Sequence, residues 1–132
     1  MMELFYVRAL IYTNSDAEYE LIRDALIGES CLIDIRRDPL DGHGHYTEHY
    51  DIIVVALDGA RGMNEVNEWT GRFPSSKVIW ITDDKEFAGI ALQKHIHDFI
   101  VRPFDIIRLR DSFRGTVANS SGANSWHIPS SV

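Results

Sequence analysis

Five short runs of β-branched and aromatic residues recur along the chain, and segments with helical spacing separate most of them. Apolar runs of this length, bounded by turn residues, predict β-strands. Because parallel neighbours need crossover connections, the alternation predicts a parallel sheet with helices on both faces. The five runs are LFYVRALIY (4–12), CLIDIRR (31–37), DIIVVA (51–56), KVIWIT (77–82) and HDFIV (97–101).

The segment after the first run carries the clearest helix signals. Ser15 and Glu18 have the spacing of a capping box, an apolar stripe follows at helical spacing, and Gly28 supplies a stop. Weaker patterns of the same kind predict further helices, which cover residues 63–73, 83–94 and 106–113.

This order of elements predicts an α/β fold of the flavodoxin-like, doubly wound kind, with a five-stranded parallel sheet in three α/β/α layers. In such sheets ligands bind beyond the carboxyl ends of the strands. Any site is therefore expected in the loops that follow Tyr12, Ala56, Ile81 and Val101.

A chain of 132 residues fits one domain of ordinary size. We expect that domain to cover residues 1–116, because residues 117–132 turn to Ser, Asn and Gly and read as a flexible tail or the start of a linker. The single cysteine, Cys31, lies in an apolar run and reads as a buried thiol without a redox role.

Charge and hydropathy exclude some functions. The 20 acidic and 13 basic residues give a formal charge of −7, which disfavours direct contact with nucleic acid. No apolar run approaches the roughly 20 residues of a membrane helix, and the first residues lack a signal-peptide pattern. We therefore expect a cytoplasmic protein without membrane contact.

Over residues 4–115 the chain resembles a receiver domain of two-component response regulators. The resemblance rests on GARGM (59–63) after the third apolar run, on Thr82 at the end of VIWIT, and on the pair Arg102-Pro103 before Phe104. The order of strands and helices is the fourth feature. The resemblance implies a signalling module rather than an enzyme, with a histidine kinase or an output domain as possible partners.

The resemblance also shows where the chemistry of a receiver is missing. A working receiver carries an acceptor aspartate, an acidic pair for Mg²⁺ and a lysine that steadies the charge, because phosphoryl transfer depends on charge neutralisation. Aligned on GARGM, the acceptor position is Ala56, the acidic pair falls on Thr13 and Asn14, and the lysine position is Arg102. Only Thr82 keeps its type. We therefore expect a degenerate, pseudo-receiver site with weak or absent Mg²⁺ binding and no catalytic residue.

Asp58 and Arg102 allow more than one interpretation. Asp58 lies two residues past the acceptor position and is expected to be a turn residue beside Gly59, although it is also the candidate acceptor of an atypical receiver. Arg102 has the chemistry to hold a carboxylate or phosphate, or to pair with Asp58 or Asp83 across the loops. Thr82 equally fits the N-cap of the next helix, and Phe99 stands where receivers often carry an aromatic that swings on activation.

Three histidines in one glycine-bent loop are weak candidates for metal ligands: His43, His45 and His49. Their spacing matches no zinc motif, so we expect a solvated loop and no cofactor, with a flavodoxin-like ligand-binding or metal-binding protein as the alternative function. The main expectation is regulation by protein contacts in a two-component or transcriptional pathway. Mixed charges between Asp84 and Arg114 suggest a homodimer through the last two helices and the fifth strand.

Overall fold

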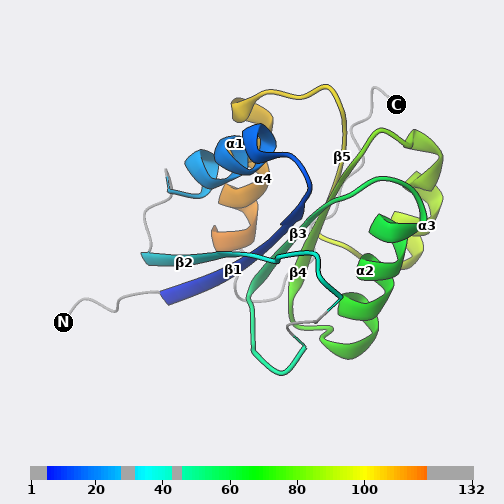
Figure 1. Cartoon of the computed structure of the whole chain (residues 1–132), viewed down its shortest axis with the longest axis horizontal. Coiled ribbons are helices and arrows are strands. Elements are labelled where there is room, and N and C mark those ends of the chain that lie inside the picture. Colours follow the sequence, from blue (N-terminus) through cyan, green and yellow to red (C-terminus); the bar gives the residue numbers. More distant parts are fainter. Residues whose placement is uncertain (1–5, 28–31, 43–45, 119–132) are drawn as a thin grey trace.

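The structure, a computed structural model, describes residues 6–27, 32–42 and 46–118. A single five-stranded sheet lies at its centre, all neighbouring strands are parallel, and the strand order is β2-β1-β3-β4-β5 (Figure 1). This confirms the predicted flavodoxin-like α/β sheet. The strands are β1 (Tyr6–Thr13), β2 (Leu32–Arg37), β3 (Ile52–Ala56), β4 (Lys77–Thr82) and β5 (Asp98–Val101).

Helices cover both faces of the sheet, which gives the predicted three layers (Figure 1). One face carries α1 (Asp16–Ile27) and α4 (Ile106–Ala118), which contact each other. The other face carries α2 (Gly59–Arg72) and α3 (Ala88–Gln93), and a 3-10 turn, η1 (Lys85–Phe87), precedes α3. None of the helices in the described parts of the chain is both long and apolar enough to cross a lipid bilayer.

The uniform apolarity of DIIVVA follows from burial on both sides. Val54 and Ala56 face a largely aliphatic cluster under α1 and α4, whereas Ile53 and Val55 face a cluster with aromatic rings under α2 and α3. On the aromatic side, Trp69 Nε1 donates a hydrogen bond of 2.9 Å to the Tyr12 hydroxyl, so its polar atom is satisfied in the core.

Two boundaries differ from the sequence prediction. The helix expected over 83–94 is the 3-10 turn η1 followed by the short α3, because Asp83 and Asp84 donate their backbone N–H groups to side chains rather than entering a helix. Helix α4 runs to Ala118, beyond the stretch 106–113 over which apolar spacing predicted a helix. Gly28, Cys31 and residues 119–132 lie outside the described residues.

Candidate functional site

The carboxyl edge of the sheet brings together four loops that are far apart in sequence. They follow β1 at Thr13, β3 at Ala56, β4 at Thr82 and β5 at Val101, and these strands are neighbours and parallel, so their ends meet at one edge. The predicted site positions in these loops therefore lie in one region, as the sequence indicated.

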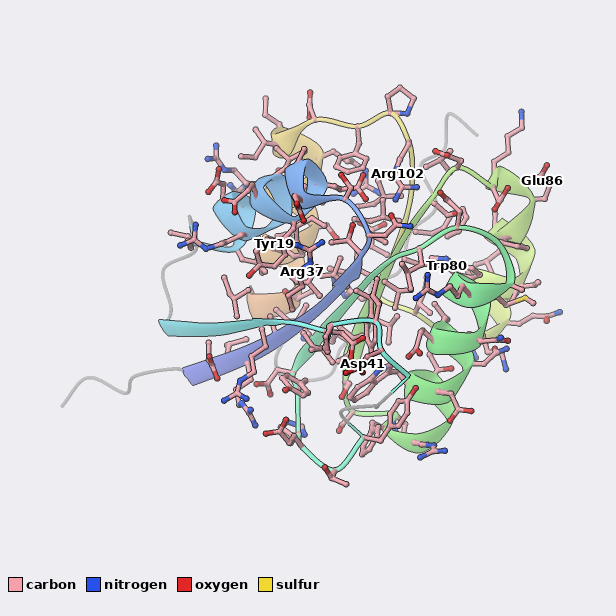
Figure 2. The ribbon with its side chains drawn as sticks, in the orientation of Figure 1. Tyr19, Arg37, Asp41, Trp80, Glu86 and Arg102 are labelled. Carbon is pink, nitrogen blue, oxygen red and sulfur yellow. The ribbon has the colours of Figure 1, made fainter. Side chains whose placement is uncertain are left out.

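Arg102 lies at the centre of this edge, near the start of α1 (Figure 2). Its guanidinium holds Glu18 with two parallel hydrogen bonds, Nε to Oε2 at 2.7 Å and Nη2 to Oε1 at 2.7 Å. The third nitrogen, Nη1, donates to Asp58 Oδ1 at 2.9 Å and lies 3.6 Å from Asp83 Oδ1. The predicted pairing of Arg102 with Asp58 or Asp83 is thus present with both, and Glu18 is a further, closer partner.

The two halves of this ion-pair network differ in burial. The Glu18 side chain is 14% exposed and that of Arg102 21%, whereas Asp58 exposes 50% of its side chain. Hydrogen bonds from Arg102 to Glu18, together with the charges of Glu18 and Asp58, outweigh desolvation and raise the pKa of Arg102. Arg102 is therefore a permanent cation, fixed mainly by Glu18.

A single oxygen of Asp58 accepts three hydrogen bonds. Oδ1 receives the Asp83 backbone N–H at 2.8 Å, Arg102 Nη1 at 2.9 Å and the Thr82 hydroxyl at 3.1 Å. Burial by itself would raise the pKa of Asp58, but the Asp83 amide, the Arg102 charge and the Thr82 hydroxyl together lower it below the usual value. Asp58 is thus an ionised ligand of the neighbouring loops as well as the turn residue before Gly59, whose φ is +65°.

The Thr82 hydroxyl forms hydrogen bonds with residues of two loops, the one after β3 and the one after β4, and Thr82 is not the N-cap of a helix. Its hydroxyl oxygen accepts the Asp84 N–H at 3.1 Å, and the N-cap position of η1 is Asp84. Asp84 Oδ2 in turn accepts the Gly59 N–H at 3.1 Å, so a second contact joins the loops after β3 and β4.

The acceptor and acidic-pair positions carry no carboxylate. Ala56 is buried, and its carbonyl oxygen lies 3.4 Å from Arg102 Nη2. Thr13 is buried and accepts the Ser15 N–H at 3.1 Å, while the next carboxylate along the chain, Asp16, pairs with Arg37 at 2.8 Å. Mg²⁺ requires several hard oxygen ligands in an octahedron. The residues at this edge do not fit that requirement, because Arg102 and Arg37 already pair with the nearby carboxylates and no group of three metal-ligating side chains forms among the described residues.

Phe99 is half-buried and packs against the core. Its ring meets that of Trp80 edge to face, with centroids 5.5 Å apart, and Trp80 stacks on Phe87 at 5.2 Å. The aromatic at the switch-like position therefore packs beside its cross-strand neighbour Trp80 on the face covered by α2 and α3, and Trp80 connects it to η1.

The histidine loop offers no metal site in the part of the chain that the structure describes. His49 is exposed and its Nε2 lies 3.1 Å from Asp51 Oδ1, whereas His43 and His45 lie outside the described residues. No group of three metal-ligating side chains forms among residues 6–27, 32–42 and 46–118.

Sequence reasoning did not find Glu18 as a site residue. The capping-box pattern gave its side chain a local role, and one half of that pattern is present: the Glu18 N–H donates to Ser15 Oγ at 3.1 Å. Its carboxylate, however, crosses to Arg102, 84 residues further along the chain. The sequence does place an acidic side chain in the first helical turn after β1, which lies at the carboxyl edge, and this position could have identified Glu18 as a site residue.

Comparisons with solved structures place the fold among receiver domains. A CheY-like receiver domain protein from Methanospirillum hungatei superposes with a TM-score of 0.71 at 16% identity, covering 89% of this chain and 98% of that chain. An orphan response regulator of H. pylori gives 0.67 at 18% identity, covering 84% and 96%. A putative pilus assembly protein from Sinorhizobium meliloti gives 0.62 at 17% identity, covering 83% and 99%.

No family model matches the sequence, and no curated protein matches it either. At these identities the structural likeness concerns the fold, and it is the receiver fold, with the strand order 2-1-3-4-5. Likeness of fold by itself does not assign a function.

Proposed function

We propose that this protein is a receiver-like signalling module, not an enzyme, that acts by protein–protein contacts without aspartyl phosphorylation. One observation carries the proposal: the acceptor position at the end of β3 is Ala56, which is 1% exposed and has no group that could take a phosphoryl group. The receiver fold of the relatives supports the signalling role by analogy.

The charges at the site support the same conclusion. In phosphoryl transfer a divalent cation and a fixed positive side chain neutralise the developing charge. Here Glu18 and Asp58 neutralise the one cation at the centre of the edge, Arg102. Because these two carboxylates already take up the guanidinium, the proposed module needs neither metal nor phosphate to hold Arg102 in place.

The partner we propose is a protein or a second copy of this chain, bound through α3, β5 and α4. Leu92, Val101 and Ile107 are exposed apolar side chains, one on each of these three elements. Exposed charges of both signs on α4 suit the rim of such an interface. A histidine kinase, an output domain or a transcriptional regulator would be partners of this kind.

The test is Mg²⁺ followed by beryllofluoride, observed by amide NMR, together with mass analysis after treatment with acetyl phosphate. Beryllofluoride mimics an aspartyl phosphate where a carboxylate and a metal coexist, so we expect no saturable shift and no phosphoryl adduct. An Mg²⁺-dependent adduct that disappears in Asp58→Asn would overturn the proposal and make the protein an atypical receiver that uses Asp58.

A further inference from the structure

Three donors converge on one point at the carboxyl edge, two from consecutive residues at the end of β4 and one from the loop after β5. The Thr82 hydroxyl, the Asp83 backbone N–H and Arg102 Nη1 all lie within 3.1 Å of Asp58 Oδ1. One donor is neutral and movable, one is a fixed backbone group and one is a permanent cation. Donors of this kind around one oxygen are the usual composition of an oxyanion site.

The donors keep their places through contacts that do not involve Asp58. Thr82 is the last residue of β4 and is fully buried, and its carbonyl oxygen accepts the Arg102 backbone N–H at 3.0 Å. The Arg102 guanidinium is held by its two hydrogen bonds to Glu18. The pocket is therefore built by the end of β4, the loops after β4 and β5, and Glu18 of α1, while Asp58 comes to it from the loop after β3 with half of its side chain exposed.

We propose that these donors form an oxyanion pocket that Asp58 fills as a ligand from the protein's own chain. When Asp58 fills the pocket, its hydrogen bond with the Asp83 N–H joins the loop after β3 to the loop before η1. This contact fixes the position of η1, where the Phe87 ring stacks on Trp80. The inference rests on the proposed function, because it gives a module without phosphorylation a permanently occupied regulatory site.

Local charge defines the ligand class of this pocket. If Asp58 lost its carboxylate, Glu18 and Asp83 would still face the single guanidinium, and Asp84 Oδ2 would remain 3.5 Å from the Thr82 hydroxyl. A phosphate dianion would be repelled by these three carboxylates. A small monocarboxylate restores the original charge, so formate is the ligand we expect the emptied pocket to take.

The experiment is chemical rescue of Asp58→Ala, followed through the Asp83 and Asp84 amide signals at constant ionic strength. We expect the substitution to shift both signals and formate to return them saturably towards their wild-type positions, while chloride does not. In Asp58→Ala/Thr82→Val, where one neutral donor is missing, formate should bind about fivefold more weakly. Wild type is the matched control and should not respond.

Asp83 is the other carboxylate that reaches Arg102 Nη1, so the titration is repeated in Asp58→Ala/Asp83→Asn, which keeps the backbone donor. If formate leaves both amide signals unmoved in both backgrounds, or acts no differently from chloride, the pocket does not exist. If β1 amide signals show that the variants are unfolded, the wild type decides instead: its Asp83 amide must titrate together with the Asp58 carboxyl, and independent titration overturns the inference.

The outcome is separable from that of the proposed function. A beryllofluoride response of the wild-type protein would contradict phosphorylation-independent signalling, whatever formate does to the variants. A failed rescue with a silent beryllofluoride spectrum would remove the oxyanion pocket alone.

Discussion

The two edges of the sheet both carry arginine ion pairs, but the pairs connect different kinds of structure. At the carboxyl edge Arg102 joins Glu18 on α1 to Asp58 in the loop after β3, so side chains bind loops to one another. At the amino edge Arg108 on α4 holds Asp98, the first residue of β5, with two hydrogen bonds of 2.6 and 2.8 Å. There the same chemistry fastens a helix to a strand.

Further contacts strengthen the difference. Near the amino edge Lys77 Nζ donates to the Thr116 carbonyl at 2.6 Å, and His97 Nε2 lies 3.2 Å from the Ser112 carbonyl. Both acceptors are backbone atoms of α4, which cannot move without moving the helix. The carboxyl edge is therefore the place where a local change can reposition loops, and the amino edge is the place where it can only loosen packing.

The largest loss of stability is expected from Gly62→Ala, because α2 packs at this position against the backbone that leads to the carboxyl edge. A Cβ at this position in α2 would overlap the backbone carbonyl of Leu57, next to Asp58. Such overpacking against main chain should lower the free energy of unfolding by about 2–3 kcal/mol. Gly71→Ala is the control in the same helix: nothing lies within 4 Å of its Cβ, so about 0.5–1 kcal/mol of stabilisation is expected. Urea unfolding of both variants checks this, and equal effects would refute it.

Arg102→Gln and Arg108→Gln compare the edges directly. Without Arg102 the mostly buried Glu18 carboxylate loses its cationic partner, which should lower the free energy of unfolding by about 2 kcal/mol. The loss of Arg108, whose side chain is about a third exposed, should lower the free energy of unfolding by about 1 kcal/mol. In amide NMR we expect Asp83 and Asp84 to shift in the first variant and to stay unchanged in the second. Shifts of the same size in both would mean that the edges are not distinct.

The smallest effect is a pH dependence at the amino edge. Burial lowers the pKa of His97 below 6.5, the ordinary value, despite the Ser112 carbonyl and Asp98. The unfolded chain then binds more protons than the folded one, so stability is greatest above pH 6.5 and declines as pH falls towards the folded pKa. Thermal unfolding from pH 7.5 to 5 should show a flatter profile for His97→Gln than for wild type. His95→Asn, a substitution of an exposed histidine, is the control variant.

The sequence pattern predicts much of this fold because each strand is short, apolar and followed by turn residues. The five strands, their parallel arrangement and the loops that carry the site all follow from that alternation. The absence of an acceptor carboxylate at Ala56 is equally visible in the sequence. The helix expected over 83–94 was wrong in extent, because apolar spacing does not register side chains from other loops that compete for backbone N–H groups.

The sequence by itself determined the layers of the fold and the loss of the residues that receiver chemistry needs, since periodicity and residue type are local properties. Only the tertiary structure decided what replaced them. Glu18 and Arg102 are 84 residues apart, and Asp58 and Arg102 are 44 apart. A pairing of this kind depends on which strand ends meet and how far each side chain reaches, and neither is encoded in a local pattern.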